Sequence, residues 1–182
     1  RRGQRLVIGP WIHGGSPASV SGKYNFGTNA AAGAIDVMGR TLRYYDHWLK
    51  NKDNGVAEEP PVHIFVMGSN IWRYENEWPP ERAKPTKYFL DSKGKANTLN
   101  GDGSLRIDKT GQDPPDIYVY NPINPVPTLG GQLCCDQAFQ ASGAYDQRPV
   151  ETRDDVLVYT SSPMEMDTEV TGPVTVTLYA GW

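Results

Sequence analysis

Short apolar runs separated by turn residues are the feature of this sequence that most limits its fold. The 182-residue chain contains 19 glycines and 15 prolines, and both residue types interrupt helices and long strands. From Pro60 onward the apolar runs are short and tend to alternate with polar residues. We expect strands at residues 62–67, 87–90, 104–107, 116–120, 155–160 and 174–179. Many short strands between such turns predict an antiparallel β-sandwich or jelly roll.

One segment, residues 36–50, predicts a helix instead. Asp36 is a suitable N-cap, and Lys50 and Lys52 suit the negative end of the helix dipole. We expect Asn54-Gly55 to end the helix. One stripe at helical spacing contains Val37, Thr41, Tyr45, Trp48 and Leu49, with Met38 and Leu42 beside it. Such a stripe more often packs against a core than binds a ligand.

A histidine in a glycine-flanked loop is the strongest candidate for chemistry. The apolar run Leu6–Ile8 predicts a strand, and Gly9-Pro10-Trp11-Ile12-His13-Gly14-Gly15 follows it directly. A histidine exchanges protons near neutral pH, so His13 could act as a general base. The chain contains no Gly-x-Ser-x-Gly, so the nucleophile of such a base would lie outside it. These residues alone leave a purely structural loop histidine open. Residues 16–35, which follow, predict a long surface loop.

Composition and charge exclude several classes of function. The net charge of −3 gives no reason to expect a nucleic-acid partner. No apolar run approaches the roughly 20 residues of a membrane span, and the first residues do not resemble a signal peptide. The adjacent Cys134 and Cys135 lack the spacing of a zinc site, and we expect them to be ordinary reduced residues. We expect both ends of the chain to be truncation points within a larger protein. Any N-terminal targeting signal would then lie outside this sequence, so the localisation stays open.

The other polar candidates are interpreted as structural. His47 lies on the predicted helix, and His63 lies inside a predicted strand on the same face as Phe65. Neither histidine pairs with a second ligand at a metal-binding spacing. Asp36 follows His13, whereas the acid precedes the histidine in hydrolase triads, so we interpret it as a helix cap. The acidic and aromatic segment at 72–81 favours a domain interface over a ligand groove.

Several segments resemble one family in the order in which they occur. LVIGPWIHG at residues 6–14 looks like the catalytic-histidine segment of the X-prolyl dipeptidyl-peptidase/cocaine esterase family of serine hydrolases. YYDHWLK (44–50) resembles the helix after that histidine, and residues 61–80 resemble the entry to the family's C-terminal jelly roll. Residues 125–131, 146–161 and 169–180 resemble its later loops and strands. The resemblance covers nearly the whole chain.

This resemblance implies a mixed fold in two parts. Residues 1–55 would be the C-terminal edge of an α/β-hydrolase domain. Residues 56–182 would be an antiparallel β-sandwich, of the jelly-roll, galactose-binding-like kind, with the boundary near residues 52–61. His13 would be the triad histidine, with the serine and the aspartate upstream of residue 1 and with Pro10 and Trp11 holding the loop.

The function that the resemblance implies is hydrolysis of an ester or an X-Pro peptide, without a cofactor. The implied partners are a small ester or peptide substrate and the missing hydrolase and cap domains of the same protein, with no nucleic acid and no membrane. The fragment alone would be inert. The alternative is a non-catalytic β-sandwich module for binding or interaction, with carbohydrate as one possible ligand, in which His13 is an ordinary loop residue. A pure binding module has no use for a strand, a histidine loop and a helix ahead of its sandwich.

Overall fold

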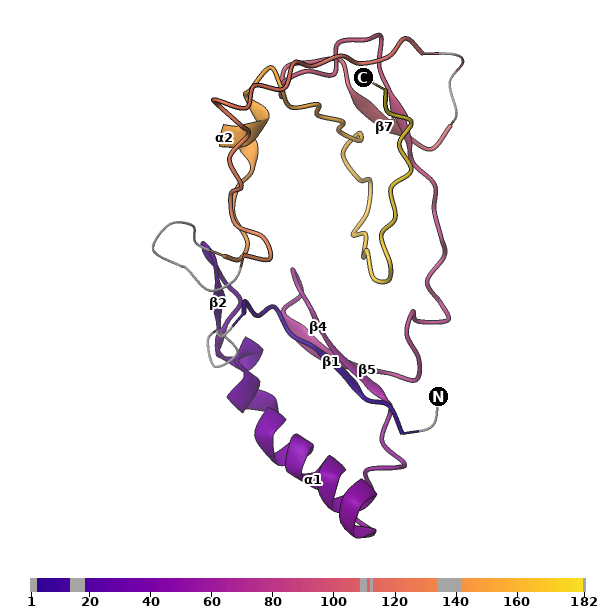
Figure 1. Cartoon of the computed structure of the whole chain (residues 1–182). Helices are drawn as coiled ribbons and strands as arrows, with labels where there is room; N and C mark the ends of the chain where they lie inside the picture. Colours follow the sequence, from indigo (N-terminus) through magenta and orange to yellow (C-terminus); the bar gives the residue numbers. More distant parts are fainter. Residues whose placement is uncertain (1–2, 14–18, 109–110, 112, 134–141, 182) are drawn as a thin grey trace.

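The computed structural model describes residues 3–13, 19–108, 111, 113–133 and 142–181. The predicted state of Cys134 and Cys135 lies outside these residues. The described elements, in chain order, are β1 (Leu6–Ile8), β2 (Val20–Ser21), β3 (Tyr24–Asn25), the 3₁₀ turns η1 (Thr28–Ala30) and η2 (Ala32–Ile35), α1 (Val37–Lys50), β4 (Val62–Val66), β5 (Ile71–Glu75), β6 (Phe89–Asp91), β7 (Ser104–Arg106) and α2 (Arg148–Glu151). In Figure 1, α1 and the strands β1, β4 and β5 form one end of the molecule, and β7 and α2 lie at the other.

A three-stranded sheet in the order β1-β4-β5 forms the best-packed part of the molecule. β1 runs parallel to β4, with Leu6 opposite Val62 and Ile8 opposite Ile64. β4 then pairs antiparallel with β5. The predicted strand at 62–67 is confirmed, one residue shorter, whereas β5 was not predicted. Because β1 precedes residues 52–61 and β4 follows them, one sheet spans the expected domain boundary.

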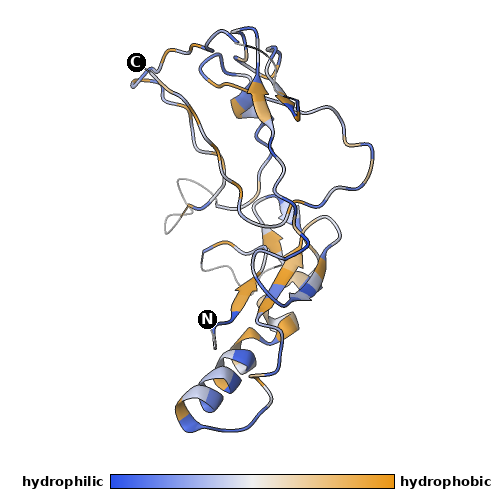
Figure 2. Ribbon diagram, turned by 90° about the vertical axis from the view of Figure 1, so that its right-hand side faces the viewer, coloured by the Kyte–Doolittle hydropathy of each residue, from blue (hydrophilic) through white to orange (hydrophobic). Residues whose placement is uncertain are grey.

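β4 is buried because both of its faces are covered. Val62 and Ile64 are each 4% exposed, and His63 and Phe65, on the opposite face, are 6% and 7% exposed. Phe65 joins Phe26 and Ala30 in a small core cluster. The ribbon coloured by hydropathy shows the same concentration of apolar residues along the central strands (Figure 2).

The helix α1 occupies the predicted residues and is capped as expected. The Asp36 side chain accepts a hydrogen bond from the Gly39 amide at 3.0 Å, which satisfies one of the free N–H groups of the first turn. The helix ends at Lys50, as predicted, but the residue that terminates it is Asn51, in a left-handed conformation with φ of 53°, and not Asn54-Gly55.

The apolar stripe of α1 and the two residues beside it, Met38 and Leu42, do not meet a core within the described residues. Met38, Leu42 and Leu49 are 70%, 61% and 74% exposed, respectively. Their spacing is that of a packed helix face, so the expected packing surface is present while its partner is absent from the described residues.

Residues 16–35 are more structured than the sequence predicts. Within the described part, β2 and β3 form an antiparallel hairpin in which Val20 lies opposite Asn25. The turn η1 follows the hairpin directly. These elements rest on tertiary contacts: the Lys23 amide bonds to the Ala144 carbonyl at 2.9 Å, and Phe26 packs against Phe65.

The later part of the chain forms fewer strands than predicted. β6 and β7 pair as an antiparallel hairpin near the expected positions. The strands expected at 116–120, 155–160 and 174–179 are wrong for the described residues, where only isolated bridges from Leu157 and Thr160 occur. An alternating sequence favours an extended chain, but a strand also needs a neighbour to complete its hydrogen bonds.

One carboxylate, that of Asp116, joins three segments of this later part, in addition to backbone hydrogen bonds such as those from Val158 to Ala96 and from Leu105 to Thr160. Asp116 accepts hydrogen bonds from the Ser92 hydroxyl at 2.7 Å, the Tyr159 hydroxyl at 2.5 Å and the Ala96 amide at 2.8 Å. Ser92 and Ala96 are buried. Three segments that form little regular structure are therefore joined through one side chain.

Strands outnumber helices along the described chain, and this small helical content is consistent with a C-terminal β-sandwich domain. Neither helix of the described residues is long and apolar enough to cross a membrane.

Candidate functional site

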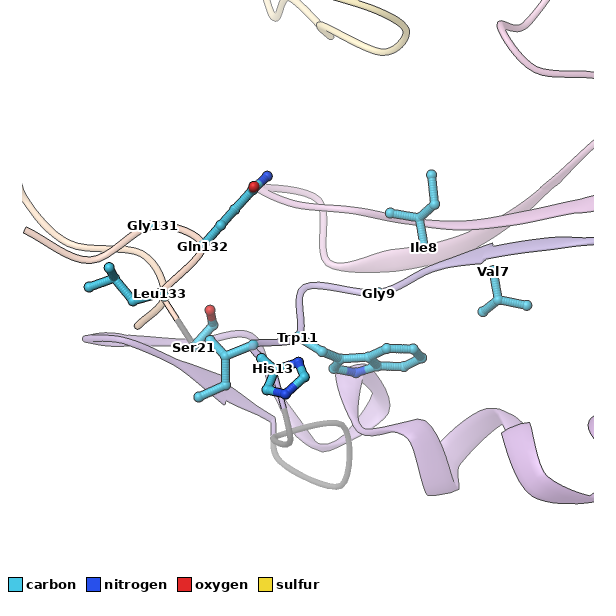
Figure 3. A pocket seen from close by; sticks show the side chains of 11 residues that line it. Val7, Ile8, Gly9, Trp11, His13, Ser21, Gly131, Gln132 and Leu133 are labelled. Atoms are coloured by element: carbon cyan, nitrogen blue, oxygen red, sulfur yellow. The ribbon is translucent and has the colours of Figure 1, made fainter. Parts of the chain in front are cut away.

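His13 lines a pocket at the end of β1. The chain leaves β1 at Ile8 and turns at Gly9 and Pro10, and the His13 side chain is exposed. Figure 3 shows this pocket, which has a volume of about 560 Å³. It is lined by Val7, Ile8, Gly9, Trp11, Ile12, His13, Ser21, Gly131, Gln132, Leu133 and Gly143. The size is that of a small-molecule site.

Two distant parts of the chain build this pocket. Residues 7–13 supply one wall, and Gly131, Gln132 and Leu133 supply another from a much later loop (Figure 3). Backbone hydrogen bonds of 2.7 and 3.0 Å between Gly131 and Gly143 fix this loop.

Sequence reasoning found His13 but missed the later contributors to the pocket. The only signal near them was the segment 125–131, which stops just before Gln132. Ser21, a buried residue of the β2–β3 hairpin, carried no signal at all.

The pocket contains one imidazole that could accept a proton, that of His13. Among the described residues, His13 makes no hydrogen bond and no ion pair, and no cluster of three histidine, cysteine or acidic side chains suits a metal ion. The arrangement suits proton transfer by an accessible imidazole.

Trp11 fixes the loop that carries His13. Its indole Nε1 donates to the Ala30 carbonyl at 2.7 Å, and its ring centroid lies 5.7 Å from that of Trp72 on β5. The Trp11 ring also covers Gly9, where an added Cβ would stand 2.3 Å from the ring atom Cε2. Glycine at position 9 therefore allows this tryptophan to fold back over the backbone of its own loop.

His63 lies on β4 against the rings of Trp72 and Tyr74, and it does not line the His13 pocket. It stacks on Tyr74 with 4.0 Å between ring centroids and an interplanar angle of 8°. Burial, with a smaller contribution from the Arg40 charge, lowers the pKa of His63 to about 4. His63 is therefore neutral near pH 7, and its surroundings agree with the structural role predicted for it.

The other candidates also lie away from the pocket residues. The Nδ1 atom of His47 is 2.9 Å from the Lys52 carbonyl oxygen at the end of α1. Asp36 caps the start of the same helix. Both side chains thus have local roles in the helix.

The acidic and aromatic segment contains an ion-pair network. Glu75 accepts hydrogen bonds from Arg82 and from Arg73, and Arg73 also binds Glu169 through two hydrogen bonds of 2.8 and 2.6 Å. The Arg82 and Arg73 guanidinium groups, against some opposing effect of burial, hold the pKa of Glu75 near 2. This network ties β5 to a segment near the end of the chain, which is a structural role.

The fold thus defines a mostly β module with a histidine-bearing loop joined to its first sheet. The family of X-Pro dipeptidyl-peptidase C-terminal non-catalytic domains matches residues 54–181. The chain therefore belongs to the C-terminal region of the X-Pro dipeptidyl-peptidase/cocaine esterase family.

Two curated relatives are named as esterases. The chain is 35% identical to a cocaine esterase of Rhodococcus sp. (strain MB1 Bresler) over 175 residues, which cover 96% of this chain and 30% of that protein. It is 30% identical over 191 aligned positions to a protein described as a serine esterase from Mycobacterium bovis, covering 97% of this chain and 26% of the relative. The chain thus spans less than a third of the relatives' length.

A solved structure has a similar fold. The crystal structure of an aminopeptidase from a marine sediment archaeon, Thaumarchaeota archaeon, matches with a TM-score of 0.60 and 25% identity, over 88% of this chain and 25% of that one. The esterase alignments cover almost the whole chain. They therefore extend before residue 54, where the matched family domain begins, into the segment that contains His13.

Proposed function

We propose that this chain is the C-terminal portion of a serine hydrolase that cleaves an ester or an X-Pro peptide. The observation that carries the proposal is the position of His13, which lies just after a strand and faces a pocket of about 560 Å³. Esterase alignments that extend across this segment support it.

His13 would be the histidine of a Ser-Asp-His triad. It would accept the serine proton during attack on the acyl carbonyl and then protonate the leaving alcohol or amine. In the second half of the reaction it would activate water to release the acyl group. The serine and the aspartate would come from the larger protein, since the described residues bring no carboxylate into contact with His13. The chemistry needs no cofactor.

The proposed role of His13 in a serine hydrolase also implies a division of the chain into two domains. Residues 1–55 form the C-terminal edge of an α/β-hydrolase domain, and residues 56–182 form a β-sandwich of the jelly-roll, galactose-binding-like kind. The parallel pairing of β1 with β4 crosses this boundary, so the two parts would be joined by one sheet. The exposed stripe at Met38, Leu42 and Leu49 supports a partner, which would be the hydrolase and cap domains of the larger protein.

A second candidate function is a non-catalytic binding or interaction module. The description of the matched family as a non-catalytic domain favours it for residues 54–181. In that case His13 is a loop residue, and the pocket serves binding alone.

Substitution of His13 in the longer protein separates the two candidates. We expect His13→Ala to lower turnover of p-nitrophenyl esters or X-Pro anilides by about 10³-fold or more while the fold stays intact. His47→Ala is the matched control, because it removes a half-buried imidazole on α1 that does not line the pocket and should leave turnover unchanged. Unchanged activity in His13→Ala would refute the catalytic proposal, and the preferred substrate would distinguish an esterase from a peptidase.

A further inference from the structure

We infer that Trp72, which belongs to the domain described as non-catalytic, is a positioning residue for His13. The inference rests on the proposed function of His13 as a general base. Trp72 lies on β5, within the matched residues 54–181. It acts through the turn η1 and through Trp11, two residues before His13.

Two indoles, one from each part of the chain, are anchored on the same turn. Trp11 Nε1 donates to the Ala30 carbonyl at 2.7 Å, and Trp72 Nε1 donates to the neighbouring Asn29 carbonyl, also at 2.7 Å. The two rings contact each other at a tilt of 47°. The loop of His13 and the hairpin of the later domain therefore share one anchoring point.

The turn η1 is itself held by the later domain. The Asn29 side chain donates to the Asn70 carbonyl, in the β4–β5 turn, at 2.7 Å. Ala30 is fully buried in a cluster with Phe26 and Phe65, against which Trp72 packs. Because Asn70, Phe65 and Trp72 come from β4, β5 and their connecting turn, a shift of this hairpin shifts η1 with it.

The path from the turn to His13 is short. The indole of Trp11 is hydrogen-bonded to the Ala30 carbonyl and packs against the backbone of Gly9. These two contacts restrict the conformation of the loop backbone at Trp11. A general base must lie within about 2.6–3.2 Å of the proton that it takes, and a misplacement of about 1 Å lowers the rate by about 10²-fold. Loss of the Trp72 bond therefore acts on catalysis through the position of His13.

The side chain of Trp72 offers a clean way to separate positioning from packing. Phenylalanine would retain a ring against Phe65 and His63, whose centroids lie 5.3 and 4.8 Å from that of Trp72. It would lose only the N–H donor and part of the ring. Trp48→Phe is a matched control, because Trp48 lies on α1 against Tyr44 and His47, away from η1.

The test measures kcat, KM and the pH profile of the longer protein, with active sites counted by a serine-directed inhibitor. We expect Trp72→Phe to lower kcat per active site by about 10-fold to 10²-fold, with KM changed less than about twofold. The acid limb of the kcat/KM profile should move to lower pH, because a misaligned imidazolium loses stabilisation by its triad acid. In Trp48→Phe, neither quantity should change.

A double-substitution experiment tests the shared anchoring point. Because both indoles act through η1, Trp11→Phe combined with Trp72→Phe should lower kcat by less than the product of the single effects. Multiplicative effects would overturn the shared pathway. If Trp72→Phe fails to fold, Asn29→Ala, which removes an exposed side-chain bond to the same turn, should lower kcat in the same direction. An unchanged kcat in that variant would overturn the inference.

Failure of this inference is distinguishable from failure of the proposed function. If His13→Ala abolishes turnover while Trp72→Phe changes only the melting temperature, Trp72 has a structural role and His13 is still catalytic. If His13→Ala leaves turnover intact, the proposed function fails, and the positioning role fails with it.

Discussion

Replacement of Asp116 by alanine should loosen the later part of the chain more than any other single truncation there. One carboxylate accepts three hydrogen bonds, from Ser92, Ala96 and Tyr159. Burial opposes ionisation of Asp116, but the three hydrogen bonds together hold its pKa below the ordinary value. The group is therefore ionised at neutral pH, and each bond is assisted by charge.

The magnitude follows from the donors that the substitution leaves behind. A buried donor without a partner costs about 1–3 kcal/mol. The Ser92 hydroxyl and the Ala96 amide lie in buried residues, so we assign about 1–1.5 kcal/mol to each. Tyr159 is only partly buried and regains water, which leaves about 0.5 kcal/mol. The expected loss is about 3 kcal/mol for Asp116→Ala, and about half of that for Asp116→Asn, which keeps one acceptor oxygen.

Hydrogen exchange measured by mass spectrometry on the longer protein reads this effect locally. A loss of about 3 kcal/mol corresponds to roughly 150-fold faster exchange in peptides that cover residues 92–97, since 1.4 kcal/mol is a factor of ten. Asp154→Ala is the matched control, because it removes an exposed carboxylate close to Tyr159 in sequence. If Asp116→Ala accelerates exchange by less than about fivefold, or no more than the control does, the reasoning is refuted.

Two further predictions concern charge and exposed surface. Because hydrogen bonds from Arg82 and Arg73 hold the pKa of Glu75 near 2, against an ordinary value of 4.5, its stabilisation is complete above about pH 5 and is lost as the pH falls toward 2. Glu75→Gln should therefore flatten the fall in melting temperature between pH 5 and 2.5, and an unchanged slope would contradict this account. Leu42→Glu with Leu49→Glu should reduce binding of a hydrophobic dye by residues 1–182 but destabilise the longer protein by several degrees, since the exposed stripe is expected to be covered there. A longer protein with an unaltered melting temperature would show that this face stays open to solvent.

The His13 site was predictable only as far as its local motif extends. A strand, a Gly-Pro turn and a histidine lie within eight residues, so the sequence points to them directly. Gln132 and Leu133 reach the same pocket from a loop that is distant in the chain. No periodicity links the two segments, because their approach depends on tertiary contacts such as the hydrogen bond from the Lys23 amide to the Ala144 carbonyl.

The strand predictions failed where partners are absent. Residues 174–179 alternate as a strand should, yet Val174, Val176 and Leu178 are 77%, 72% and 67% exposed, and no ladder forms among the described residues. In contrast, β5 was missed although Trp72 and Tyr74 alternate with charged residues. The sequence analysis assigns its aromatic side chains to a domain interface, which stays a prediction. Within the described residues these side chains contact Trp11 and Arg40.

The sequence by itself determined the elements whose hydrogen bonds close within a few residues. α1 and its Asp36 cap fall into this group, because helix periodicity and capping are local properties. Only the tertiary structure decided the parallel pairing of β1 with β4 and the meeting of Trp11 and Trp72 on one turn. These contacts join residues far apart in the chain, and their stability depends on which surfaces the fold brings together and buries.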